Sequence, residues 1–234
     1  MQLFYNPNIT ETDTTFSFDK DESKHIVKVL RKNVGDTLNI TNGKGWLFTA
    51  ELDIAALKQC SVSITSKVLQ PKRNYNLHLA VAPTKMNDRY EWFLEKTTEI
   101  GIETITPIIC DHSERKVVKT ERFEKIIQSA MQQSLNCYLP KLNAPITYKA
   151  FIKEEFSGQR FIAHCEDTDK KSLKSQLQTG KNYTILIGPE GDFSVKEITQ
   201  ALNAKFIAVT LGNTRLRTET AAIAACHSVA FTNE

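Results

Sequence analysis

The sequence lacks several patterns that would assign its class at once. Its five cysteines are scattered, with none of the closely spaced pairs that a structural zinc site uses. An odd, scattered cysteine count is typical of free thiols in a reducing compartment. No segment reaches the ~18 to 20 consecutive apolar residues of a membrane-spanning helix. Neither a metal site nor membrane insertion is therefore predicted.

Other absences narrow the class further. The residues after Met1 form neither a basic segment nor a long apolar one, so we expect no secretory signal and a cytoplasmic protein. Neither the glycine-rich dinucleotide fingerprint nor a P-loop is present, which argues against a polyphosphate ligand. The net charge of +3 neither demands nor excludes a nucleic-acid partner. With 41% hydrophobic and 24% charged residues, the 234-residue chain has the composition of an ordinary globular protein.

A polar break containing Pro71 separates two parts of the chain at residues 70–74. Before it, short segments alternate apolar and polar residues as half-buried strands do: 37–41, 46–52 and 60–65. Asn42–Gly45 between the first two is typical of a hairpin turn. We therefore predict a small β-barrel domain over residues 1–70 and a second domain over residues 74–234.

One helix is predicted in the first part, over residues 21–32. Lys24, Lys28 and Arg31 recur on it at helical spacing, away from the apolar residues. These cations could form a solvated charged face or a ridge that contacts the phosphates of a nucleic acid. The helix pattern alone leaves both readings open.

The second part alternates strands and helices. Strands are predicted at 77–82, 104–109, 160–165, 183–187 and 206–210, and helices at 88–100, 121–135 and 218–231. A capping box, Ser194 to Glu197, opens another helix between the last two strands. This alternation predicts an α/β fold with a parallel sheet covered by helices. Ligands of such sheets bind at the carboxyl ends of the strands, so the loops after Ala82, Ile187 and Thr210 are candidate sites.

Two of those loops are unusual. Gly188–Gly191 places two glycines around a proline and a glutamate, which gives a tight turn that a ligand can approach closely. Leu211–Thr220 begins with small and apolar residues and becomes polar at the start of the last helix. Each loop alone could be a simple turn or helix cap. Together they could line one pocket.

These loops resemble the paired signatures of the 16S ribosomal RNA uridine-N3 methyltransferases, which belong to the trefoil-knotted (SPOUT) superfamily. The resemblance rests on residues 185–191 and 211–221, and residues 216–221 (Leu-Arg-Thr-Glu-Thr-Ala) are its most specific part. It continues, in order, over further motifs: 25–31, 35–36, Lys85 with Asp88 and Arg89, 95–101 and 133–134. It therefore covers nearly the whole chain.

The resemblance implies a homodimeric enzyme that uses S-adenosylmethionine to methylate N3 of one uridine in 16S ribosomal RNA of the small ribosomal subunit. It also implies a fold: an α/β class with a C-terminal knotted parallel-sheet methyltransferase domain (SPOUT-like) and an N-terminal PUA-like β-barrel that binds RNA. No metal is needed, because the sulfonium is already activated and the protein has mainly to position the partners. Carried over by motif, the cofactor contacts are Leu186, Gly188, Pro189, Glu190, Gly191, Leu211, Gly212, Leu216, Arg217 and Thr218.

Roles in the chemistry can be assigned on physical grounds. Uridine N3 must lose a proton to become nucleophilic, and Glu219 is the best-placed carboxylate to accept it. A guanidinium could stabilise the charge that spreads over the uracil oxygens, which suits Arg217 or Arg89. The expected RNA contacts are Lys24, Lys28, Arg31, Lys85, Arg89 and Arg115. Arg89 could instead be a surface residue paired with a nearby glutamate.

The chain departs from the family pattern at two places. Asp192 stands where the family often has a second glycine, and Leu135–Asn136 where it usually has an arginine after residues 133–134. If that arginine holds RNA, another basic residue such as Arg115 or Lys116 must replace it. The alternatives are a knotted methyltransferase acting on another ribosomal or transfer RNA site, a non-catalytic RNA-binding ribosome assembly factor, and a small-molecule α/β enzyme.

Overall fold

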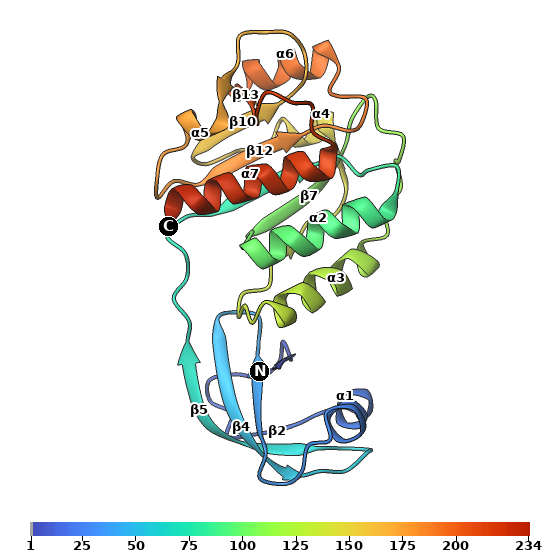
Figure 1. The fold of residues 1–234 in the computed structure, drawn as a ribbon, viewed down its shortest axis with the longest axis vertical. Helices are drawn as coiled ribbons and strands as arrows, with labels where there is room; N and C mark the ends of the chain where they lie inside the picture. Colours follow the sequence, from blue (N-terminus) through green and yellow to red (C-terminus); the bar gives the residue numbers. More distant parts are fainter. Residues whose placement is uncertain (1) are drawn as a thin grey trace. The chain divides into compact units, whose positions relative to one another are not determined.

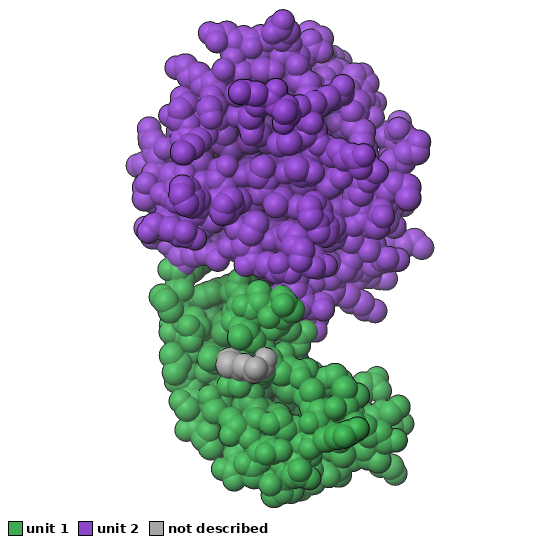
Figure 2. Space-filling view, viewed as in Figure 1, with its two compact units in different colours: residues 1–72, 131–139 green, residues 73–130, 140–234 purple. Residues whose placement is uncertain are grey.

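The computed structural model describes residues 2–234, which form two compact units (Figure 2). Unit 1 comprises the chain up to Lys72 together with Met131–Leu139, and unit 2 comprises Arg73–Ala130 and Pro140–Glu234. The predicted boundary at residues 70–74 includes the break after Lys72. The sequence did not predict that Met131–Leu139 belongs with the N-terminal part. The reading of the two units as separate RNA-binding and catalytic domains stays a prediction.

Unit 1 is built on a curled five-stranded sheet (Figure 1). Its strands, in the spatial order β1-β3-β4-β5-β2, are β1 (Leu3–Tyr5), β2 (Thr15–Ser17), β3 (Thr37–Thr41), β4 (Trp46–Ile54) and β5 (Ser61–Leu69). β3 and β4 pair antiparallel, so the predicted hairpin is confirmed. Its turn is organised by Asn42, whose side-chain oxygen accepts a hydrogen bond from the backbone N–H of Lys44 at 2.9 Å. Phe48 and Ile40 are fully buried in the core of this unit.

The helix predicted over residues 21–32 is wrong in length and in type. The α-helix α1 spans only Lys20–Lys24, and a π-helical turn, η1, spans His25–Val29. The backbone N–H of Leu30 bonds to the carbonyl of His25 at 3.0 Å, five residues back, which widens the turn. Arg31 then adopts a left-handed conformation with φ 54°. The chain therefore leaves the helix before Arg31, and the three cations do not share one regular helical face.

Unit 2 contains an eight-stranded parallel sheet, as the alternating pattern predicted. Its strands are β6 (Leu77–Val81), β7 (Thr104–Ile109), β8 (Lys141–Leu142), β9 (Ile146–Thr147), β10 (Gln159–Ala163), β11 (Lys171–Ser172), β12 (Tyr183–Ile187) and β13 (Ile207–Thr210). They lie in the order β11-β13-β10-β12-β6-β7-β8, with β9 paired to β7. β10 therefore separates the two strands whose loops were expected to meet. The predicted α/β fold class is confirmed.

Helices cover both faces of this sheet (Figure 1). They are α2 (Asn87–Ile100), α3 (Thr120–Gln133), α4 (Tyr148–Phe151), α5 (Leu173–Gln176), α6 (Val195–Asn203) and α7 (Thr218–Asn233). α2 and α7 pack side by side on one face, while α4 and α6 pack on the other against Leu186, Ile162 and Ala80. Gly101 ends α2 in a left-handed conformation with φ 110°, as predicted. The helix predicted to reach residue 135 ends at Gln133, because Leu135 is left-handed with φ 58°.

His78 makes the stability of unit 2 depend on pH. Burial, with a smaller effect of the Lys141 ammonium, lowers the pKa of His78 from its ordinary value near 6.5 to about 4. The ring is hydrogen-bonded to the hydroxyl of Thr106 at 2.7 Å. Since the unfolded chain takes up the proton first as pH falls, the stabilisation is complete above pH 6.5 and is lost as pH falls toward 4.

We expect the free energy of unfolding to fall by about 2 to 3 kcal/mol over that pH range through this residue. A His78→Gln variant should lose much of this dependence, because it carries no titratable ring. Urea unfolding of both proteins at several pH values between 7 and 4 measures the difference. An identical pH dependence in both proteins would contradict the assignment.

Candidate functional site

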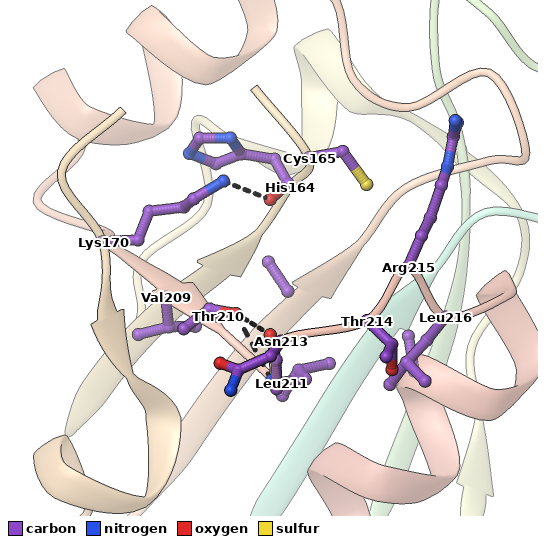
Figure 3. Close-up of a pocket in the computed structure, with 13 residues that line it drawn as sticks. His164, Cys165, Lys170, Val209, Thr210, Leu211, Asn213, Thr214, Arg215 and Leu216 are labelled. Atoms are coloured by element: carbon purple, nitrogen blue, oxygen red, sulfur yellow. Dashed lines mark hydrogen bonds between the residues drawn. The ribbon is translucent and has the colours of Figure 1, made fainter. Parts of the chain in front are cut away.

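Two adjoining cavities lie at the carboxyl edge of the sheet in unit 2. The first, of about 400 Å³, is lined by the segments that follow β10 and β13 (Figure 3). The second, of about 290 Å³, is lined by residues 187–190 after β12 and by the start of α7. Both include Cys165 and Leu216. The loops after Ile187 and Thr210 therefore line two neighbouring cavities that share residues, where the sequence suggested a single pocket.

The loop after β12 is held by close contacts. A side chain at Gly188 would place its Cβ 3.0 Å from the ring of Phe193, which is buried in the core. The hydroxyl of Thr218 donates to the carbonyl of Gly188 at 3.0 Å, which joins the start of α7 to the loop. The loop is thus close to the sheet core and to the last helix, with little room for side chains.

The structure shows what Asp192 does at the position where the family often has a second glycine. Its backbone is left-handed with φ 63°, the region that glycine adopts most easily. Its carboxylate accepts hydrogen bonds from the backbone N–H groups of Cys165 at 2.7 Å and of Phe193 at 2.9 Å. The bond from Cys165 ties the loop after β12 to the loop after β10. The aspartate therefore adds a connection between the two loops that a glycine could not make.

Glu190 and Arg115 hold the segment between β6 and α2. A carboxylate oxygen of Glu190 accepts the backbone N–H of Lys85 at 2.9 Å, and Arg115 donates to the carbonyl of Lys85 at 2.9 Å and also to the side chain of Asn87. The ammonium of Lys85 pairs with Glu114 at 2.8 Å. Lys85 and Arg115, both predicted to contact RNA, thus already make contacts within the protein. This arrangement places the segment before α2 beside the glycine loop.

The residues expected to carry the chemistry come from α2 and α7. Nε of Arg89 lies 3.9 Å from a carboxylate oxygen of Glu219, and the side chain of Glu219 is only 7% exposed. The other carboxylate oxygen of Glu219 has no hydrogen-bond partner within residues 2–234. Arg217, at the N-cap of α7, is exposed and lines the second cavity. Arg89 is thus paired with a glutamate, and neither Arg89 nor Glu219 is among the residues that line the two cavities.

The predicted cofactor contacts fall into three groups. Those that line the cavities are Gly188, Pro189, Glu190, Leu211, Gly212, Leu216, Arg217 and Thr218. Leu186 is fully buried among core residues facing α4 and α6, so it can offer a ligand only its backbone. The carbonyl oxygen of Gly191 is hydrogen-bonded to Nδ1 of His112 at 3.0 Å, so that oxygen already has a partner.

The segment after β10 also lines the first cavity, although no pattern in the sequence predicted it. Lys170 Nζ donates to the carbonyl of His164 at 2.9 Å, and Figure 3 shows the thiol of Cys165 directed toward Arg215 while the ring of His164 points to the other side. Both ring nitrogens of His164 lack a partner among the described residues. Burial, and then Lys170, lowers the pKa of His164, which favours the neutral ring. No local pattern marked this segment, because the position of β10 between β12 and β13 is set by the topology.

The three cations predicted on the first helix lie in unit 1. Lys24, Lys28 and Arg31 are all exposed. Across residues 2–234, no helix is long and apolar enough to cross a membrane. The same residues contain no group of three or more histidines, cysteines or acidic residues placed to hold a metal ion.

Comparison with known proteins identifies the class. The family described as "RNA methyltransferase domain" matches residues 70–230, and the family described as "RNA methyltransferase PUA domain" matches residues 18–65. A ribosomal RNA small subunit methyltransferase E from Buchnera aphidicola is 31% identical over 219 residues, covering 90% of this chain and 85% of that protein. A parallel α/β domain preceded by a PUA-type domain thus defines an RNA-modifying enzyme.

Solved structures of similar proteins support the same assignment to the RNA methyltransferases. A probable rRNA-methyltransferase from Porphyromonas gingivalis superimposes with a TM-score of 0.91 at 39% identity, covering 100% of this chain and 98% of that one. A ribosomal RNA small subunit methyltransferase E from Neisseria gonorrhoeae, bound to S-adenosyl methionine, has a TM-score of 0.87 at 28% identity, covering 100% and 98%. The chain belongs to the RNA methyltransferase family, and within it to the group of the small subunit methyltransferases E.

Proposed function

We propose that the protein transfers a methyl group from S-adenosylmethionine to N3 of one uridine in 16S ribosomal RNA. The main support for this proposal is the pair of adjoining cavities whose lining includes residues of both family signature loops and Arg217. Glu219 lies two residues further along, in the first turn of α7. The relatives that match over nearly the whole chain are named ribosomal RNA small subunit methyltransferase E. The cofactor is S-adenosylmethionine, which is bound in the Neisseria gonorrhoeae and Legionella pneumophila structures.

The cavities suit this cofactor. The apolar side chains of Leu211 and Leu216 line them, and Gly188 lines the second cavity without a side chain of its own. When bound there, the cofactor supplies a methyl group already activated by its sulfonium. The protein therefore has to orient the uracil ring, keep water away and remove the N3 proton.

Glu219 and its neighbours supply the remaining chemistry. The unpartnered carboxylate oxygen of Glu219 accepts the N3 proton, while Arg89 holds the other oxygen. The guanidinium of Arg217 stabilises the charge on the uracil oxygens as the proton leaves. The exposed side chain of Arg217 can reach a substrate that enters from solvent, whereas the buried Glu219 stays fixed.

The test is transfer of a labelled methyl group from S-adenosylmethionine to unmodified 16S RNA, as free RNA and as small-subunit particles. We expect incorporation with no added metal and in a chelating buffer. Transfer RNA serves as the competing substrate, since another knotted methyltransferase would prefer it. Cofactor binding without any turnover would instead support the alternative of a non-catalytic ribosome assembly factor.

Unit 1 is proposed to bind RNA through Lys24, Lys28 and Arg31. All three are exposed, although Arg31 follows the helical segment and does not continue it. Replacing all three with alanine should weaken RNA binding and lower its salt slope by about 2, because each lost phosphate contact removes released counterions. S-adenosylmethionine affinity should not change. The measurement is RNA affinity between 50 and 300 mM salt. An unaltered salt dependence would mean that these three side chains form a solvated charged face and contact no phosphate.

We also propose that the protein works as a homodimer in the cytoplasm. The dimer is implied by the family resemblance, in which each site borrows from the other subunit. Sedimentation at micromolar concentration should give twice the chain mass of 26.5 kDa. A single species at the chain mass would contradict this proposal without affecting the cofactor site.

A further inference from the structure

A third cavity of unit 2 lies at the carboxyl end of β7, outside the site described above. Its volume is about 280 Å³, and it is lined by the residues after β7 and β9 and by the first turn of α6. Three lysines from three different segments line it: Lys116, Lys149 and Lys196. All three are exposed, and none forms an ion pair with a carboxylate within residues 2–234.

The floor of this cavity is a fixed hydrogen-bonded frame. The two carboxylate oxygens of buried Glu197 accept the backbone N–H groups of Asp111 and Ser194, each at 2.9 Å. The buried hydroxyl of Tyr148 donates to the carbonyl of Glu197 at 2.6 Å. The hydroxyl of Ser194 donates to the carboxylate of Asp111 at 2.7 Å. Both carboxylates of the lining therefore already accept hydrogen bonds from the protein.

The three lysines give the lining of the cavity a net positive charge. Burial raises the pKa of Tyr148 and of Cys110, so the phenol and the thiol of the floor stay neutral. The lining carries three ammonium groups and two carboxylates, and both carboxylates belong to the frame. Three ammonium groups against two carboxylates leave the lining with an excess of one positive charge, and the carboxylates are engaged in the frame while the lysines are not paired within the described residues. The cavity therefore favours an anion, and exposed ammonium groups suit a phosphate held at the surface.

The cavity is connected to the candidate active site through one short loop. Asp111 lies at the cavity, and the next residue, His112, bonds through Nδ1 to the carbonyls of Gly191 and Asp192 at 3.0 and 3.1 Å. The cavity and the glycine loop therefore share one edge of the same sheet. A strand bound with its uridine at the glycine loop would have this edge within reach of a neighbouring phosphate.

We propose that Lys116, Lys149 and Lys196 form a binding site for a backbone phosphate of the substrate RNA. The proposal rests on the proposed function and adds a contact in unit 2 to the cations of unit 1. Such a contact reads no base and fixes the position of the strand beside the site. A long RNA is favoured over a small phosphate compound, because the three ammonium groups are exposed.

The test uses the full chain and 16S RNA transcribed in vitro. The variant replaces Lys116, Lys149 and Lys196 with alanine. A matched control replaces Lys153, Lys174 and Lys181, which are exposed lysines of the same unit outside the three cavities. Both variants lose the same charge. We expect the cavity variant to bind RNA roughly tenfold more weakly or worse, with a salt slope lower by about 2, and the control to change far less.

Further readouts separate the possible failures. S-adenosylmethionine affinity should be unchanged in both variants, and a triple Lys→Arg variant at the cavity should keep most of the RNA affinity. Equal losses in the cavity and control variants, from a wild-type enzyme that methylates the RNA, would overturn the phosphate site alone. The phosphate site would also be overturned if inorganic phosphate binds at these lysines and RNA does not displace it. A wild-type protein that neither binds nor methylates the RNA would overturn the proposed function.

Discussion

Replacing Glu219 with glutamine should slow methyl transfer at neutral pH by about 10²-fold or more, the usual contribution of a positioned general base. The structure gives this side chain the environment of a fixed base. It is buried, one oxygen is 3.9 Å from Nε of Arg89, and the other has no partner among residues 2–234. Glutamine keeps the shape but cannot take the proton. The rate should recover partly at higher pH, where uracil N3 ionises without help.

The measurement is single-turnover methyl transfer to small-subunit RNA or particles across pH. Glu95→Gln is the matched control, because Glu95 is a more exposed carboxylate on α2 that pairs with Lys96. The control should retain the wild-type rate. Thermal unfolding checks the fold of the Glu219 variant, and the loss there should be small because Arg89 is 37% exposed and water can solvate it. A wild-type rate and an unchanged pH profile would mean that Glu219 has only a structural role.

Arg217→Ala should reduce the rate by roughly 10²-fold or more, through loss of a donor to the developing oxyanion. Arg217 lines the second cavity, and its side chain makes no capping hydrogen bond to α7. Since the residue is exposed, its removal should leave the unfolding temperature almost unchanged. The effect should therefore appear in the chemical step and not in stability.

Single-turnover kinetics at saturating cofactor and RNA measure this prediction. Arg217→Lys keeps the charge but loses the planar fork, so its rate should fall between the wild type and alanine. Arg215→Ala is the neighbouring control, since Arg215 lines both cavities without an assigned role in proton removal. An equal loss at both arginines would mean that Arg217 acts only through the general charge of the loop.

Local patterns predicted much of unit 2. The parallel sheet follows from alternating strands and helices, and the capping box from Ser194 to Glu197 has both of its hydrogen bonds. The end of α2 at Gly101 was predictable because a helix commonly ends at a residue with positive φ, which glycine adopts easily. These features depend on residues close in sequence. The two glycine loops were found the same way, because each is a short run with its own composition.

The features that the sequence did not predict depend on distant residues. No single segment of the sequence determines the order of the strands. The position of β10 between β12 and β13 was therefore not predicted, nor was the position of His164 and Cys165 beside the site. Arg89 and Glu219 lie far apart in the sequence, and only the packing of α2 on α7 brings them together. In unit 1 the π-helical turn was missed because apolar spacing near Ile26 fits a regular helix equally well.

The most direct test of the account is the identity of the methylated nucleoside. Ribosomal RNA from a strain that lacks the protein is digested and compared with that of its parent by mass spectrometry, and then again after treatment with the purified protein and S-adenosylmethionine. We expect one N3-methyluridine of 16S RNA to be missing in the deletion strain, to be restored by the wild-type protein, and to be restored far more slowly by Arg217→Ala. A restored methyl group on ribose, on carbon or on another RNA would contradict it.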